Sequence, residues 1–180
     1  MNVFILHADG DRYQNLVFTS KKDWAILRQF GKRDQLSSWP APAVEVFRDD
    51  KFHRNLRPSD FPSLMGALVF SVRAVNALQW LLRENGEILP LCCTEGEYYA
   101  FNLTTSIDAL DESNSEVERF ESSGSIMQIN KYTFFADRLH GATIFKIPQS
   151  RAKIFVTDKF CQMVTDNGLL GFEFVNVWEG

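Results

Sequence analysis

The clearest pattern of apolar and polar positions runs from residue 70 to residue 91, FSVRAVNALQWLLRENGEILPL. Ser71 can accept a hydrogen bond from a free N–H group of the turn that follows it, as helix N-caps do. Asn85-Gly86 supplies a left-handed helix stop, and Pro90 marks the extended segment beyond it as an edge strand or a turn. The pattern therefore predicts a core helix that leads directly into a strand. Its apolar positions have the spacing of one helix face: Ala74, Val75, Leu78, Leu81 and Leu82.

The first part of the chain contains shorter apolar segments between turn-forming residues. Residues 3–6 and 15–18 predict two strands, which we expect to pair as a hairpin with a long loop. Residues 20–23, Ser-Lys-Lys-Asp, resemble a capping box and predict a helix that stops at Gly31. Residues 44–47 alternate as a strand does.

The stretch from residue 48 to residue 60 is charged and has no regular apolar pattern. It is the place where we expect a seam between parts of the fold. The prediction is a single domain over residues 1–180, with an N-terminal lobe over 1–55 and a main lobe over 56–180.

The remainder of the chain is patterned mainly as strands. We expect a hairpin turn at Asn130-Lys131 between two of them, and a last helix that Thr157 caps and Asn167-Gly168 stops. Because many short strands follow one another without regular alternation with helices, the fold class predicted is α+β, with a mainly antiparallel sheet and a few packed helices. The predicted strands cover residues 98–103, 125–129, 132–135, 143–147, 153–156 and 172–178.

Composition narrows the class of protein. The chain has 180 residues, 45% of them hydrophobic, and 16 phenylalanines, so we expect an aromatic-rich core. Its longest apolar run is far shorter than the roughly 20 residues of a membrane-spanning helix. The N-terminal sequence has no basic segment and reaches Asp9 too early for a secretion signal. These features predict a cytoplasmic protein that does not enter the membrane.

The distribution of charge points to the kind of partner. The net charge is −4, which argues against direct binding to nucleic acid. Residues 61–180 hold 9 basic and 15 acidic side chains, so the acidic excess belongs to the C-terminal two-thirds.

Residues of catalytic and metal-binding type are scattered. The three histidines lie far apart in the sequence, and the three cysteines form no CxxC pair. A vicinal disulfide or metal site at Cys92-Cys93 is an alternative to simple burial, and a nucleophile at Cys161 would need His140 beside it in space. We predict that the protein needs no metal and no cofactor.

Two features are candidates for binding a partner. Trp80 lies opposite the apolar stripe of the central helix; it either packs under the N-terminal lobe or is an exposed interface anchor. The second feature, the acidic run 108–121, is either a solvated loop outside the sheet or a patch that attracts a basic partner. Against the single Arg119, its acidic members are Asp108, Asp111, Glu112, Glu116, Glu118 and Glu121.

Five segments occur in an order and spacing that resemble a known family: SDFPSLMGALVFS, LLRENGEILPL, YYAFNLTTSIDALD, IFVTDKF and GLLGFEFVNVW. Over residues 56–178 the chain is similar to a family of immunity proteins from bacterial polymorphic-toxin systems, formerly catalogued as a domain of unknown function. The resemblance implies an antitoxin that binds and neutralises a cognate protein toxin delivered by contact-dependent or type VI-like secretion. It brings no catalytic residues with it.

Charge extends this expectation to the toxin. A toxin that attacks nucleic acid would be basic, and an acidic blocker could occupy its substrate groove. Two other classes of function stay open: an adaptor or scaffold module, and a hydrolase that uses Cys161 or a cluster of carboxylates.

Overall fold

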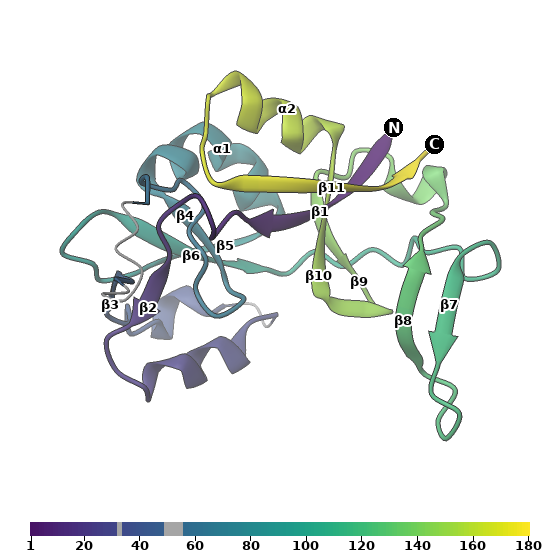
Figure 1. The fold of residues 1–180 in the computed structure, drawn as a ribbon, viewed down its shortest axis with the longest axis horizontal. Coiled ribbons are helices and arrows are strands. Elements are labelled where there is room, and N and C mark those ends of the chain that lie inside the picture. The colour runs from purple at the N-terminus through teal and green to yellow at the C-terminus, as the bar shows by residue number, and fades with distance from the viewer. Residues whose placement is uncertain (32–33, 49–55) are drawn as a thin grey trace. The chain divides into compact units, whose positions relative to one another are not determined.

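The computed structural model describes residues 1–31, 34–48 and 56–180, apart from the side chain of Arg151 (Figure 1). The chain forms two compact units. Unit 1 contains Met1–Leu6, Thr105–Cys161 and Phe174–Gly180, and unit 2 contains His7–Thr104 and Gln162–Glu173. The lobes predicted from the sequence are a different division of the chain, and residues 49–55 of the expected seam lie outside the described residues. That division stays a prediction.

The structure is of the α+β class, as predicted, but its strands form small separate sheets. The pairs β1–β10, β10–β9, β2–β3, β4–β6, β5–β6 and β7–β8 are antiparallel. Strands, α-helices and short 3-10 helices (η) follow in the order β1 (Asn2–Ala8), β2 (Leu16–Phe18), η1 (Asp23–Gln29), η2 (Leu36–Ser38), β3 (Val44–Val46), β4 (Leu68–Ser71), α1 (Val72–Asn85), β5 (Gly86–Pro90), β6 (Tyr98–Leu103), β7 (Glu116–Arg119), β8 (Ile126–Lys131), η3 (Ala136–Leu139), β9 (Ile144–Ile147), β10 (Ser150–Thr157), α2 (Asp158–Asp166) and β11 (Phe172–Glu179).

Unit 2 is built on the helix that the sequence predicts. The side chain of Ser71 accepts a hydrogen bond from the N–H of Ala74 at 3.1 Å, so the predicted N-cap is confirmed. The five apolar positions of the stripe are the buried residues of α1. The helix packs on a three-stranded sheet of order β4-β6-β5, and Pro90 lies in its edge strand, as predicted.

The end of α1 differs from the prediction. Gly86 does not adopt a left-handed conformation; it has φ 177° and ψ −159°, and the chain enters β5 there. A Cβ atom at this position would lie 2.3 Å from the carbonyl oxygen of Asn102. Glycine is therefore needed because β6 approaches closely, not because the backbone turns left-handed.

The predicted N-terminal hairpin is wrong. β2 pairs with β3, with Val17 opposite Glu45, whereas β1 pairs with β10, with Phe4 opposite Val156. No tight two-residue turn joins the two segments, so nothing local favours their pairing over these distant partners. The helix predicted after the capping box is present as η1, with 3-10 geometry and no side-chain cap.

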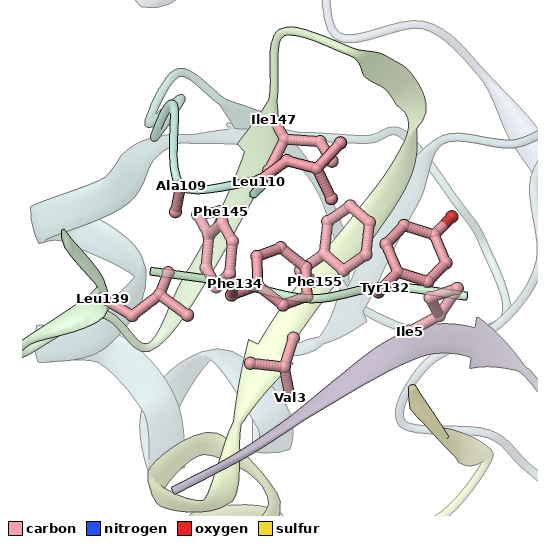
Figure 2. Close-up of a cluster of buried hydrophobic side chains, with 10 residues drawn as sticks. All are labelled: Val3, Ile5, Ala109, Leu110, Tyr132, Phe134, Leu139, Phe145, Ile147 and Phe155. Carbon is pink, nitrogen blue, oxygen red and sulfur yellow. The ribbon is translucent and has the colours of Figure 1, made fainter. Parts of the chain in front are cut away.

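The core of unit 1 is aromatic, as the phenylalanine content predicts (Figure 2). Its strands belong to a four-stranded sheet of order β11-β1-β10-β9. The rings of Phe145 and Phe155 stack at 5.7 Å, and Phe134 meets Phe155 edge-on at 5.7 Å. Such pairs add roughly 0.5–1.5 kcal/mol each beyond the burial of their surface.

The hairpin expected around Asn130-Lys131 is also wrong. Both residues lie inside β8, which pairs with β7 instead of with residues 132–135. Part of the acidic run is therefore a strand, contrary to the prediction that it lies outside any sheet. The turn prediction failed because Tyr132 and Phe134 pack in the core and do not form the second strand of a hairpin. Predicted strands at β9, β10 and β11 are confirmed, as is the end of α2 before Asn167-Gly168.

Candidate functional site

The acidic run is attached to unit 1 by two buried residues within it. Ala109 is fully buried and Leu110 nearly so, and both belong to the aromatic core in Figure 2. The N–H of Phe135 donates to the carbonyl of Ala109 at 2.9 Å, and the N–H of Asp111 donates to the carbonyl of Thr133 at 2.8 Å. The sequence I-D-A-L-D thus places its apolar residues inside and leaves its carboxylates toward solvent.

Two of the six carboxylates share a partner from a distant strand connection. The side-chain amide of Gln149 donates to Oδ1 of Asp108 at 2.9 Å and to Oε1 of Glu112 at 3.1 Å. The other oxygen of Glu112 accepts from Nη2 of Arg119 at 2.5 Å. The structure therefore brings Asp108 and Glu112 together, with the side-chain amide of Gln149 bridging the two like-charged carboxylates.

Asp111 has a structural role. Its Oδ1 accepts from the backbone N–H groups of Ser113 and Asn114 at 3.1 and 3.2 Å, and its Oδ2 accepts from the Asn114 amide at 2.7 Å. A carboxylate that bonds the backbone two and three residues on defines an Asx turn. This side chain shapes the loop that leads into β7.

The remaining three acids lie on the β7–β8 hairpin and are exposed. Glu116 is 4.0 Å from the ammonium group of Lys131, a distance at the limit of an ion pair. Glu118 accepts from the side chain of Asn130 at 2.6 Å. Glu121 lies in the loop that follows β7. These carboxylates keep oxygen atoms available to a partner.

Two large apolar side chains on the same hairpin are also exposed. Phe120 is 48% exposed, and Met127 on β8 is about half exposed. Sequence reasoning missed both, because a large apolar residue is normally assigned to the core. Exposed apolar side chains among carboxylates form a surface suited to recognition of a protein.

Trp80 belongs to unit 2, whereas the acidic residues belong to unit 1. It is 42% exposed on α1. The side chain is thus partly exposed and partly covered, and both interpretations, packing under the N-terminal lobe and an interface anchor, stay predictions. Its exposed neighbours on the helix include Asn76, Arg83 and Glu84.

The segment Ser-Asp-Phe at residues 59–61 has a structural role in unit 2. Asp60 is buried, and its carboxylate accepts from Ser71 Oγ at 2.6 Å and from the N–H of Leu170 at 2.9 Å. The ring of Phe61 stacks on that of Phe172 at 4.7 Å. This motif and GLLGF at residues 168–172 therefore bind each other.

Asn102, in the quoted segment YYAFNL, is likewise structural. It is fully buried, and its amide donates to Oε2 of Glu87 at 2.9 Å while its Oδ1 accepts from the N–H of Gly31 at 2.6 Å. Glu87 in turn accepts from the N–H of Gln35 at 3.0 Å. The pair attaches the segment around residues 31–35 to the sheet of unit 2.

Cys161 has the protonation behaviour of an unreactive thiol. Burial, and secondarily the nearby charge of Asp158, raises the pKa of the Cys161 thiol to about 12. A thiol with that pKa is protonated at neutral pH and is a poor nucleophile. Within residues 1–31, 34–48 and 56–180, no three His, Cys, Asp or Glu side chains are grouped as metal ligands. Cys92 and Cys93 are free thiols, so they do not form a vicinal disulfide in this structure. Cys92 is exposed, so simple burial does not account for a cysteine at this position.

In the part of the chain that the structure describes, no helix is both long enough and apolar enough to span a membrane.

Comparison with known proteins identifies one family. Residues 93–179 match the model of the immunity protein family Imm11. No curated protein matches the chain. The match confirms the resemblance over this segment, and it indicates a role in toxin immunity with a cognate toxin as the partner. All six acidic residues of the run lie inside the matched segment, and Trp80 lies outside it.

Proposed function

We propose that the protein neutralises a cognate bacterial toxin by binding it one to one, without catalysing a reaction. The observation that carries the proposal is the position of the exposed acidic and apolar side chains of residues 116–127 inside the segment that matches the immunity family. The protonated state favoured for the Cys161 thiol supports binding over hydrolysis.

Neutralisation by binding sets a requirement on affinity. Protection of a cell that makes or receives the toxin requires almost all of the toxin to be bound, which corresponds to a nanomolar or lower Kd, roughly −12 kcal/mol or stronger. Interfaces of this quality bury on the order of 1,600 Å² and concentrate their energy in a few side chains. Phe120 in unit 1 is the candidate for such a side chain, and Trp80 in unit 2 is an alternative candidate.

The acidic run would contribute mainly to the rate of association. Exposed carboxylates attract a basic surface over several ångströms and raise the association rate at low salt. A basic toxin is expected if its substrate is a nucleic acid, because its groove must bind phosphates. The protein would then cover that groove in the cytoplasm, the compartment that a toxin delivered by type VI or contact-dependent secretion reaches.

The structure guides the choice of substitutions for a test. Asp111 and Glu112 bond to their own chain, so reversing their charge would also disturb the loop. Glu116, Glu118 and Glu121 are better targets because they are exposed, and the contacts given for Glu116 and Glu118 are with exposed side chains of the hairpin, Lys131 and Asn130. A matched control reverses three exposed acids outside the run, Asp11, Glu97 and Glu173, which changes the net charge equally.

The experiment co-expresses the protein with the product of the adjacent gene and measures growth, then measures binding kinetics of the purified pair. We expect rescue from toxicity and a one-to-one complex. The triple change of Glu116, Glu118 and Glu121 to Lys should slow association by about tenfold at low salt and weaken its salt dependence, whereas the control triple should not. Absence of rescue together with many weak partners would favour the adaptor alternative, and turnover of a substrate abolished by Cys161→Ala would favour the hydrolase.

A further inference from the structure

The β7–β8 hairpin presents a strand edge. The two strands form a two-stranded sheet, and in the described part of the chain β7 has no strand neighbour other than β8. Figure 1 shows the hairpin as an arm of unit 1, with β7 as its outer strand. An edge strand points the N–H and C=O groups of every second residue away from its partner, where another strand can bind them.

The irregularities of the hairpin lie on β8. Between Glu116 and Val117 the partner changes from Lys131 to Ile129, and between Glu118 and Arg119 it changes from Gln128 to Ile126. The extra residues are therefore in β8, and the four residues of β7 each have a partner. Bulges twist a strand and spoil its edge, so the edge of β7 is the more regular of the two.

The charges of β7 select what can pair with it. Glu116 and Glu118 lie on the strand and Glu121 follows it, all exposed. A second copy of β7 paired with the first would bring carboxylates near carboxylates, and like charges across two strands are unfavourable. An extended segment with Lys or Arg at alternate positions would instead meet opposite charges.

Exposed apolar surface lies at the end of the same strand. Phe120 follows β7 directly, and its N–H donates to the carbonyl of Ser125 at 3.0 Å, which closes the loop of the hairpin. The ring of Phe120 is 48% exposed at this end of the strand. In strand addition, backbone bonds supply much of the affinity and side chains beside the edge supply specificity.

We propose that the toxin binds by adding a basic extended segment to the edge of β7 as a third strand, with Phe120 as the apolar anchor beside it. This inference rests on the proposed function, because the occupant is the toxin. It goes further by assigning the binding mode, the strand that is used and the chemistry of the segment that pairs with it.

Hydrogen–deuterium exchange tests the binding mode on the complex with the product of the adjacent gene. We expect amide exchange within residues 116–119 to slow by about tenfold or more in the complex, as outward N–H groups become bonded. A one-to-one complex in which exchange at β7 is unchanged would overturn strand addition and leave the proposed function standing. If no complex forms and growth is not rescued, both fail.

Two variants test the anchor. Phe120→Ala should weaken binding by about tenfold or more, and Phe47→Ala is its matched control because Phe47 in unit 2 is 47% exposed. Equal effects of the two changes would overturn the role of Phe120. Exchange protection at β7 that grows with the concentration of the free protein would identify a second copy as the occupant, which contradicts the proposal.

Discussion

Arg73, near the start of α1, forms an ion pair with Asp60 and also hydrogen-bonds to the turn after α2. Nη1 of Arg73 donates to Oδ2 of Asp60 at 2.6 Å. Nη2 of the same guanidinium donates to the carbonyls of Asn167 and Gly168 at 2.9 and 2.7 Å. The Asp60 side chain is only 9% exposed whereas that of Arg73 is 52% exposed, so the two partners have unequal importance for stability.

Removing Asp60 should cost more than removing Arg73. Asp60→Ala leaves the hydroxyl of Ser71 and the N–H of Leu170 without their acceptor, which we expect to cost about 2–4 kcal/mol. Arg73→Ala should cost less, about 1–2 kcal/mol, because water can replace part of an exposed guanidinium. Urea unfolding of both single variants and the double variant measures the coupling between them. Equal costs, or additive effects in the double variant, would contradict this account.

Gly171→Ala should combine strain with a steric clash. Gly171 has φ +90°, and a Cβ atom there would lie 2.1 Å from Oγ of Ser59. Gly66 has φ +82° and open space around it, so Gly66→Ala introduces strain alone, about 1–2 kcal/mol. We expect Gly171→Ala to be more destabilising than this control in thermal and urea unfolding. Similar losses for the two variants would show that the contact with Ser59 is not tight.

Leu78→Ala tests the packing of α1. Leu78 is fully buried on the core-facing side of α1, so its truncation should reduce the free energy of unfolding by about 2–5 kcal/mol. The control is Leu36→Ala, which removes an exposed leucine and should change stability by less than about 0.5 kcal/mol. A loss below that value for Leu78→Ala would show that the helix is peripheral.

The Cys161 thiol should make stability fall at alkaline pH. Its pKa is about 12 in the folded protein against an ordinary value of 9.0. Between these values the unfolded state has lost the proton and the folded state retains it, so the unfolded state binds fewer protons and stability decreases as pH rises. Buried Tyr98 and Tyr132, whose pKa values are also raised by burial, act in the same direction.

Comparison with Cys161→Ala isolates the cysteine. The free energy of unfolding of the wild type should fall more steeply between about pH 9 and 12 than that of the variant. Thiol labelling of the native protein at pH 8 provides a second measurement, with exposed Cys92 as the internal reference. Labelling of Cys161 as fast as Cys92 would contradict its raised pKa.

Part of the candidate site could be read from the sequence. The run contains many acidic residues and few apolar ones. This composition predicted that Glu116, Glu118 and Glu121 are exposed. The roles of Asp111 and Glu112 could not be predicted, because the groups they bond become neighbours only when the loop and strand form. Phe120 was missed because the sequence does not reveal that β7 is an edge.

What the sequence determined by itself is local. The cap at Ser71, the apolar stripe of α1, and the edge position implied by Pro90 depend on contacts within a few residues or on the chemistry of one residue, so the pattern was sufficient. The pairing of strands was decided by the tertiary structure. β1 pairs with β10, about 150 residues later in the chain, and β8 pairs with β7 instead of with residues 132–135. The reason is that the burial of aromatic side chains in a common core outweighs proximity in sequence.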